Sequence, residues 1–441
     1  MWSNDAYPQQ LATFITEHWF DVEAGDAAQS EFELPGLPML EALLSTAFQA
    51  SLLREEEQAL LFRLILAEPK FFNETDGPPQ GLHRLVFEEE VPCNPLELKG
   101  LAHAASFYRS LLGVRLDPVK GPMIWGIVHS GPRWLQAQHG GRGVGPELPP
   151  TVVINVTGAG CIEVSKGSHT VGQLSQGKVF GPGTNVFQAG WLQDMFAQTR
   201  AERTDLHNQA RAKSGEDWAA LDPELTHIID QHMMKRVLGA IRAFRHGGTL
   251  IMVPPERGEE LLKPNKFLNV RHKFEEGESR GRFRTLIVSI MNTLAQSTSS
   301  DASRHPISWL DYQNSTDSRI AKLDEAIFEM SHLIAALSTV DGAVVLSRRF
   351  ELLGFRAEIR CDFADIHMIA RALDLEGKRF KNESTGGVGT RHRSAYQLCT
   401  ELKDALVVVI SQDGGVRFIR WNEDHVMYWD HHATFAFSQR F

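Results

Sequence analysis

The chain has 441 residues, of which 42% are hydrophobic and 23% are charged, as is usual for globular proteins. This length predicts two or three domains. The formal net charge is -10, with no block of like charges. This argues against a nucleic-acid polymer as a partner, because proteins that bind one usually present a basic face or tail.

The four cysteines are widely spaced and form no CxxC pair, so neither a zinc knuckle nor a disulfide framework is expected. No apolar run approaches the ~20 residues that a bilayer crossing needs. The start of the chain also lacks the positively charged segment and apolar stretch of a signal peptide. We therefore expect a cytoplasmic protein with no membrane partner.

Residues 296–303 are small, polar and aperiodic, which predicts a linker. We place this linker over residues 296–317. It separates a larger N-terminal α+β region, residues 1–295, which could hold two subdomains, from a C-terminal domain, residues 318–441. The expected fold class is mixed α+β, with a C-terminal mixed β-sheet flanked by helices.

In the N-terminal region, apolar residues at helical spacing predict one or two helices over 39–66 and a long helix over 221–244. Residues with β-branched side chains on both sides of a glycine turn predict two strands within 149–164. The long helix ends at a His-Gly-Gly turn, and a strand is expected over 249–253.

The C-terminal domain is expected to begin with a long helix capped by Asp317 or Ser318, because apolar residues then recur at steps of three and four. A strand over 342–347 follows directly. The other predicted elements are a strand over 351–359, a helix over 365–373, a loop over 377–389, a helix over 391–402, and a hairpin of strands over 405–411 and 416–421.

One arrangement occurs twice along the chain. The helix, His-Gly-Gly turn and strand that end at residue 253 resemble the helix, turn and strand around Asp341. The N-terminal region could therefore contain a degenerate relative of the C-terminal fold. Helix–turn–strand units are common, however, and this resemblance alone does not establish a repeat.

Asp341-Gly342-Ala343 lies where the long C-terminal helix gives way to a strand. Glycine has no side chain, so a ligand can approach the backbone of Gly342 closely. A carboxylate beside an exposed backbone can bind a divalent metal or polarise a hydroxyl group. A turn that merely ends a helix would also explain Asp-Gly, so a functional interpretation needs a second motif.

The second motif, Gly389-Thr390-Arg391-His392-Arg393, is expected at a helix start, with Thr390 as the N-cap. The N-terminal end of a helix binds phosphate well, and arginine favours bidentate contacts with phosphate. Two arginines in a first turn are electrostatically unfavourable, because cations suit the other end of a helix. Such a departure often marks a functional site.

Ser411 is the last residue of the strand expected over 405–411, and Asp413 follows it in the turn. The carboxylate of Asp413 could join a metal site, and the hydroxyl of Ser411 could contact phosphate. An ordinary hairpin turn would also explain both residues.

Together, the two motifs and residues 404–415 resemble the diadenylate cyclase domain, a family of enzymes that make cyclic di-AMP. The resemblance covers residues 318–435. It implies that two domains face each other, each holding one ATP, and that the ribose 3′-hydroxyl of each ATP attacks the α-phosphorus of the other. The N-terminal region resembles the sensor domains attached to some of these cyclases.

The resemblance also implies roles for individual residues. Asp341 would activate the 3′-hydroxyl and help to hold Mg²⁺ or Mn²⁺, and Asp413 would join the metal site. Arg391, His392 and Arg393 would act on the triphosphate of ATP. The remaining substrate contacts would come from Gly342, Ala343, Gly389, Thr390 and Ser411. Self-association would be needed to pair two sites.

Two features depart from the family pattern. Ser411-Gln412-Asp413 stands where the family usually has Ser-Glu-Glu, and residues 347–350 are more basic than expected. Neither change removes a required chemical group. Two alternatives remain: a nucleotide-binding sensor module that has lost turnover, and a cyclase that makes another cyclic dinucleotide. The two retained carboxylates argue against the first alternative, because binding alone would not need both.

Overall fold

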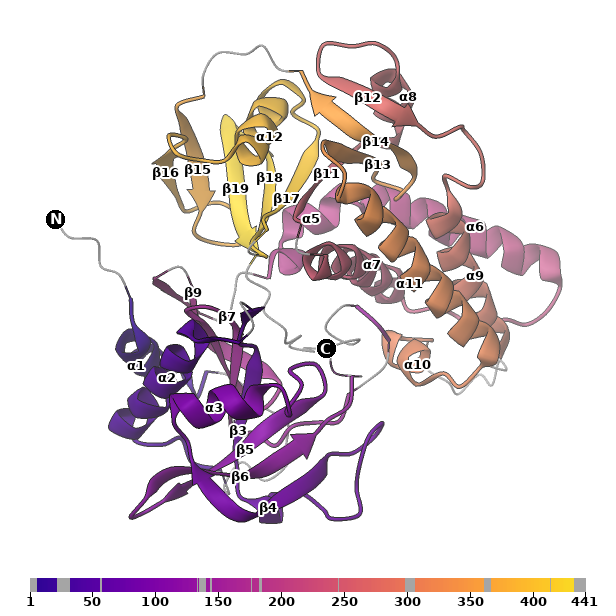
Figure 1. The fold of residues 1–441 in the computed structure, drawn as a ribbon. Coiled ribbons are helices and arrows are strands. Elements are labelled where there is room, and N and C mark those ends of the chain that lie inside the picture. Colours follow the sequence, from indigo (N-terminus) through magenta and orange to yellow (C-terminus); the bar gives the residue numbers. More distant parts are fainter. Residues whose placement is uncertain are drawn as a thin grey trace. The chain divides into compact units, whose positions relative to one another are not determined.

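The computed structural model describes residues 6–21, 32–55, 58–132, 134, 140–142, 145–175, 177–181, 185–244, 246–297, 306–360, 366–412 and 414–431. The chain divides into two compact units (Figure 1). The first comprises Met1–Gln138, Gly143–Gly183 and Ala433–Phe441, and the second comprises His139–Arg142 and Thr184–His432. Each unit has helices and a mixed sheet, so the predicted mixed α+β class is confirmed. Within the ranges given above, no helix has both the length and the apolar character needed to cross a membrane.

The first unit is built on an eight-stranded sheet with the order β10-β9-β8-β7-β3-β5-β6-β4. Strands β3 and β5 run parallel, and the other neighbours run antiparallel. A separate ribbon pairs β1 with β2. The strands span Arg54–Glu55 (β1), Gln58–Ala59 (β2), Phe62–Leu66 (β3), His83–Pro92 (β4), Ser110–Asp117 (β5), Gly121–His129 (β6), Val152–Gly158 (β7), Cys161–Lys166 (β8), His169–Ser175 (β9) and Lys178–Phe180 (β10).

Helices cover one face of this sheet. Side chains alternate between the two faces along a strand, and Phe62, Leu64 and Ile154 share a buried core with residues of three helices. The helical elements of this unit span Pro8–His18 (α1), Leu37–Leu52 (α2) and Pro95–Ala102 (α3), with a 3-10 turn at Pro69–Phe71 (η1). The larger core of the first unit therefore lies between α1–α3 and one side of the sheet, and a smaller buried cluster, which includes Ile65, Trp125 and Val153, lies on the other side.

The second unit is built on a nine-stranded sheet with the order β12-β14-β13-β11-β17-β18-β19-β15-β16. The parallel pairs are β11–β13 and β15–β19. Strand β11 lies between β13 and β17, which makes it a central strand. The strands span Gly248–Val253 (β11), Leu268–Lys273 (β12), Ala343–Ser347 (β13), Leu352–Ile359 (β14), Met368–Ala372 (β15), Phe380–Ser384 (β16), Leu406–Ile410 (β17), Val416–Asn422 (β18) and His425–His431 (β19).

Helices pack on both faces of the nine-stranded sheet (Figure 1). Alternate residues of β11 show the division: Leu250 and Met252 join the core formed with α7, α9 and α11, whereas Ile251 and Val253 join the core formed with α8 and α12. The helices span Gly190–Met195 (α5), Ala197–Ser214 (α6), Pro223–Ala243 (α7), Pro255–Leu262 (α8), Arg282–Ser297 (α9), Trp309–Asn314 (α10), Ser318–Ser338 (α11) and Thr390–Glu401 (α12), with a 3-10 turn at Val186–Gln188 (η2).

The repeated helix–turn–strand arrangement lies within this one unit. Strands β11 and β13 are parallel neighbours, and helices α7 and α11 pack against each other. The arrangement in residues 221–253 is therefore not part of a separate N-terminal fold. It contributes helix α7 and the central strand β11 to the same unit and sheet as β13, the strand that follows Asp341.

Some predicted elements differ from the structure. Residues 39–66 contain one helix, α2, followed by β1–β3. The helix predicted over 365–373 is wrong, because strand β15 lies there, and the loop predicted over 377–389 contains strand β16. Strand β15 pairs with both β16 and β19, so backbone pairing with other strands determines these elements.

The second unit begins earlier in the chain than the domain boundary expected at residue 296. Strands β11 and β12 come before that position and belong to the same sheet as β13. Residues 298–305 of the expected linker lie outside the described residues. The described remainder, 306–317, contains α10, and its Ile307, Trp309 and Tyr312 are buried in the helical core.

Candidate active site

Three turns meet at one edge of the nine-stranded sheet. In the parallel pair, Leu250 of β11 lies opposite Val344 of β13, so Gly248 is level with Gly342. In the antiparallel pair, Gly248 lies opposite Ile410 of β17. Adjacent strands are about 4.8 Å apart. The turns before β13, before β11 and after β17 therefore lie within about 10 Å of one another. We call this region the edge site.

Asp341 and Gly342 form the exposed turn between α11 and β13. Gly342 has φ +109°, a backbone conformation that residues with a side chain rarely adopt. A Cβ atom at this position would lie 2.9 Å from the backbone of Arg356. Glycine thus lets the turn approach strand β14 closely. The turn presents the carboxylate of Asp341 in a solvent-exposed segment at the edge of the sheet.

The turn between α7 and β11 contains His246 and Gly247, which sequence analysis did not assign to the site. Nη1 of Arg391 donates a hydrogen bond to the carbonyl oxygen of His246 at 3.0 Å. Gly247 has φ +66°, and a Cβ there would lie 2.9 Å from Nη1 of Arg391 and 2.5 Å from the carbonyl oxygen of Ile410. The resemblance of this turn to the one before β13 was the signal that could have identified it.

Helix α12 brings the second sequence motif to the edge site. Its N-cap is Gly389 rather than Thr390, which is the first helical residue. Thr390, Arg391 and Arg393 are exposed, whereas His392 is half-buried, with its ring centroid 6.4 Å from that of Tyr396. The contact with His246 places Arg391 at the turn before β11. Arg393 is two residues further on, which is about 200° around the helix axis.

Ser411 follows β17 and helps to close the hairpin between β17 and β18. Its hydroxyl donates to the carbonyl oxygen of Gly415 at 3.1 Å. A Cβ on Gly414 would lie 3.4 Å from Nε of Arg242, which places this guanidinium, from the last turn of α7, beside the hairpin. Asp413 lies outside the described residues, so its position in the site stays a prediction.

The edge site is locally rich in positive charge. Arg242 lies beside the β17–β18 hairpin, Arg391 is bonded to the neighbouring turn, and the N-terminus of α12 contributes the positive end of a helix dipole. Of the acidic residues in the sequence motifs, Asp341 is the one that the structure places at the edge site. These positive groups suit a polyphosphate better than a cation. They contrast with the chain as a whole, which has a net charge of -10.

A metal ion would find only part of its ligand set in the protein. Among the described residues, no group of three or more His, Cys, Asp and Glu side chains could hold a metal ion. Magnesium is usually bound by one or two carboxylates together with phosphate oxygens of a substrate. The exposed carboxylate of Asp341 fits such an ion, one that is bound together with a phosphate ligand.

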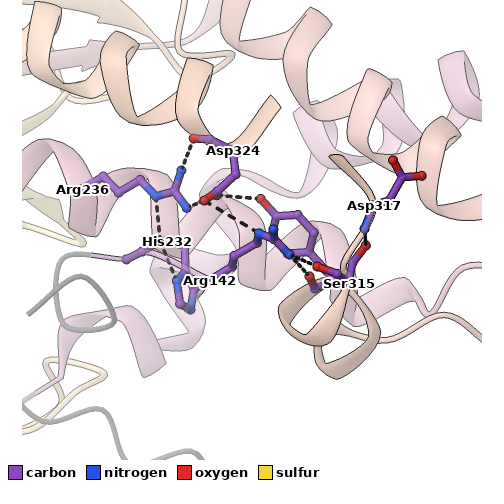
Figure 2. Close-up of polar contacts among 8 residues, drawn as sticks. Arg142, His232, Arg236, Ser315, Asp317 and Asp324 are labelled. Carbon is purple, nitrogen blue, oxygen red and sulfur yellow. Dashed lines mark hydrogen bonds and ion pairs between the residues drawn. The ribbon is translucent and has the colours of Figure 1, made fainter. Parts of the chain in front are cut away.

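A polar network ties together α7 and α11, the helices that lead into the turns at His246 and Asp341 (Figure 2). Nη2 of Arg236 in α7 donates to Oδ1 of Asp324 in α11 at 2.5 Å. The hydroxyl of Tyr312 donates to the same oxygen at 2.9 Å. Because Arg236 and Tyr312 are buried, this network fixes the two helices relative to each other.

Residues 140–142 add to this network (Figure 2). The carbonyl oxygen of Gly140 accepts a hydrogen bond from Nε of Arg236 at 2.7 Å and lies 3.0 Å from Nδ1 of His232. Nη1 of Arg142 donates to the carbonyl oxygen of Ser315 at 2.6 Å. This segment is therefore an integral part of the second unit, although the residues on both sides of it belong to the first.

We expect His232, which is partly buried, to make the protein less stable in acid. Burial, and then the nearby charge of Lys235, lower the pKa of His232 well below its usual value of 6.5. Below pH 6.5 the unfolded chain binds a proton that the folded state does not, so the free energy of unfolding falls as the pH falls. The loss begins as the pH falls through about 6.5 and grows towards lower pH.

Denaturant unfolding of the wild type and His232→Gln at pH 7.5 and pH 5.5 measures this effect. The difference in unfolding free energy between the two pH values should be smaller in His232→Gln. His246→Gln, at an exposed position, should keep the wild-type difference. Identical pH dependence in the wild type and His232→Gln would contradict the prediction.

We also expect Gly247→Ala to destabilise the protein. A side chain at φ +66° costs about 1–2 kcal/mol in backbone energy, and the new Cβ would overlap the carbonyl oxygen of Ile410. Denaturant unfolding should therefore show a clear loss of stability. Gly277→Ala is the matched control, because a Cβ there meets no atom within 4 Å. Equal stability of the two variants would show that the turn tolerates a side chain.

Residues 29–129 match the family model of a probable sensor domain, DACNV. The match begins in residues that lie outside the described ranges and extends through α2, α3 and β1–β6 of the first unit. Comparison with curated proteins and with solved structures gives no match. The first unit thus contains a probable sensor domain, and the edge site belongs to the other unit.

Proposed function

We propose that the protein is a diadenylate cyclase, which joins two ATP molecules into cyclic di-AMP and releases two pyrophosphates. The observation that carries this proposal is the convergence of the Asp341 turn and Arg391 at one edge of one sheet. The sensor-domain match adds support, because DACNV domains are associated with diadenylate cyclases. The first unit would then be the regulatory part of the enzyme.

The chemistry of this proposal needs a base near a ribose hydroxyl and cations around the triphosphate. We assign the first role to Asp341, whose carboxylate polarises the 3′-hydroxyl so that its oxygen can attack the α-phosphorus. Gly342 and Ala343 allow ATP to approach the backbone. Arg391 and Arg393 hold the triphosphate and stabilise the charge that develops on it.

The remaining predicted residues complete the substrate contacts. Gly389 and Thr390 offer the N-terminal end of α12 to phosphate, and His392 and Ser411 offer hydrogen-bonding side chains. Asp341 and Asp413 would hold Mg²⁺ or Mn²⁺. When bound, such an ion neutralises negative charge on the phosphates as the pyrophosphate leaves.

Each edge site holds one ATP, so two copies of the protein must meet for the reaction to occur. We propose that the edge sites of two second units face each other. The 3′-hydroxyl of the ATP in each site can then attack the α-phosphorus of the ATP in the other. A change in how the copies pair would then alter the rate without altering any catalytic residue. A sensor domain could act in this way.

Incubation of the full chain with ATP and Mn²⁺ or Mg²⁺, followed by mass spectrometry, tests the proposal. Cyclic di-AMP and pyrophosphate as products would support it. Bound but unchanged ATP would instead indicate a binding module without turnover. A product containing guanosine, formed from mixed nucleotides, would indicate a cyclase with another specificity.

A further inference from the structure

The face of the eight-stranded sheet opposite to α1–α3 carries a row of polar residues. Arg63 of β3 lies opposite Asn155 of β7, which lies opposite Glu163 of β8. All three are nearly inaccessible to solvent, with 3%, 6% and 2% of their surface exposed. Burying polar and charged groups is costly unless they are well paired, so the row calls for an explanation.

Arg63 retains unused capacity for hydrogen bonding. Its Nε donates to Oδ1 of Asn155 at 3.2 Å, but its Nη1 has no hydrogen-bond partner among the described residues. The guanidinium carbon lies 3.8 Å from the ring centroid of Trp134, which fixes the plane of the group. Burial lowers the pKa of Arg63 to about 9, so the group is still charged at neutral pH.

A pocket that is partly open to solvent lies over this row. The residues that line it include Arg63, Ser130, Trp134, Asn155, Glu163 and Ser165. The pocket combines an aromatic wall, formed by Trp134, with a few polar groups, as small-molecule sites do. The buried polar row therefore forms the floor of a cavity that a small ligand can reach.

We propose that this cavity binds a small organic acid that has a carboxylate at one end and a hydrogen-bond donor at the other, such as an amino acid or a hydroxy acid. The planar guanidinium of Arg63 matches a carboxylate, which accepts two parallel hydrogen bonds from such a group. Glu163 lies two strands away, about 10 Å between Cα atoms. Its carboxylate can accept a hydrogen bond from the far end of the ligand.

Glu163 also limits which acids fit. Its Oε1 accepts hydrogen bonds from the hydroxyls of Ser165 at 3.2 Å and Thr170 at 2.8 Å. These contacts hold the carboxyl group in place within the cavity. A second carboxylate on the ligand would meet this acidic group, so acids with one carboxylate and an amino or hydroxyl group are favoured over dicarboxylates.

The test measures thermal unfolding of the full chain, without ATP, in the presence of single amino acids, hydroxy acids and dicarboxylates. At least one amino acid or hydroxy acid should raise the unfolding temperature of the wild type, and its affinity can then be measured by calorimetry. If no member of these two classes binds the wild type, the proposal is wrong. This first result depends on no variant and is independent of cyclase activity.

Two variants then locate the site. Arg63→Lys keeps the charge but loses the bidentate contact, and we expect at least about tenfold weaker binding. Arg115→Lys, in neighbouring β5 and outside the lining of the cavity, is the matched control and should bind as the wild type does. Should Arg63→Lys not fold, Trp134→Ala removes the aromatic wall instead and should also weaken binding. Unchanged affinity in the folded variant would overturn the assignment of this cavity.

Discussion

Asp341→Asn is expected to lower the rate of cyclic di-AMP formation by about 10²-fold or more, while ATP still binds. Asparagine is close to aspartate in size, but it cannot accept the proton of the 3′-hydroxyl, and general base catalysis typically contributes at least this factor. Binding should persist because the cationic groups at α12 remain. Mass spectrometry of the products and calorimetric titration with ATP give the two quantities separately.

Asp424→Asn is a matched control for this substitution. Asp424 is also an exposed aspartate in a turn, but it lies between β18 and β19, at the end of β18 away from the edge site. Its replacement should leave the rate unchanged. Arg391→Ala, in contrast, should weaken ATP binding itself. Equal turnover in the wild type and Asp341→Asn would refute the role assigned to Asp341.

Asp230→Ala is expected to cost about 3–5 kcal/mol of unfolding free energy. Asp230 of α7 forms an ion pair with Arg203 of α6, and their side chains are only 7% and 1% exposed. Burial raises the pKa of Asp230, and the charges of Arg203 and Arg200 oppose this shift. Removal of the carboxylate would leave the guanidinium of Arg203 charged and buried with no acidic partner, which is the costly outcome.

Denaturant unfolding of three variants tests this explanation. The double variant Arg203→Met with Asp230→Leu removes both charges and fills the space, so it should recover much of the stability that Asp230→Ala loses. Glu358→Ala, which breaks the exposed pair with Arg271, should change the unfolding midpoint little. If Asp230→Ala were no worse than Glu358→Ala, the buried pair would not contribute as described.

Long elements with a clear periodic pattern were predictable from the sequence. Helices α7 and α11, strand β13 and the β17–β18 hairpin occur close to their predicted positions. The expected cap of α11 is also present, with the side chain of Asp317 accepting a hydrogen bond from the backbone N–H of Arg319. In each case local signals, namely apolar spacing, a cap or a glycine turn, agree with the final fold.

Elements that depend on pairing with other strands were not predictable. Strand β16 has the sequence Phe-Lys-Asn-Glu-Ser, with little β-branched or apolar character, and it is a strand because it pairs with β15. Strand β11 lies between β13 and β17, which come about 90 and 155 residues later in the chain. The linker expected after residue 295 placed β11 in a different domain from β13 and β17. Local composition carries no information on sheet order, so it could not correct this.

The residues of the candidate site also differ in whether local sequence signals could identify them. Arg391 stood out because arginines at a helix start are locally unusual, and Asp341 and Gly342 gained a functional interpretation only together with that second motif. His246, Gly247 and Arg242 did not stand out, since their proximity to Arg391 and the β17–β18 hairpin follows from the order of strands. Only the similarity between the turns before β11 and β13 pointed to them.

The contacts of residues 140–142 have a consequence for fragments of this protein. A fragment that starts at Thr184 would lack Gly140 and Arg142, so Nε of Arg236 would lose its carbonyl acceptor and the carbonyl oxygen of Ser315 would lose its guanidinium donor. A lower rate in such a fragment would then combine the loss of the sensor domain with damage to the pair of helices that lead into the turns of the edge site. Point substitutions in the intact chain avoid this ambiguity, and they are the better way to assign inhibition or activation to the first unit.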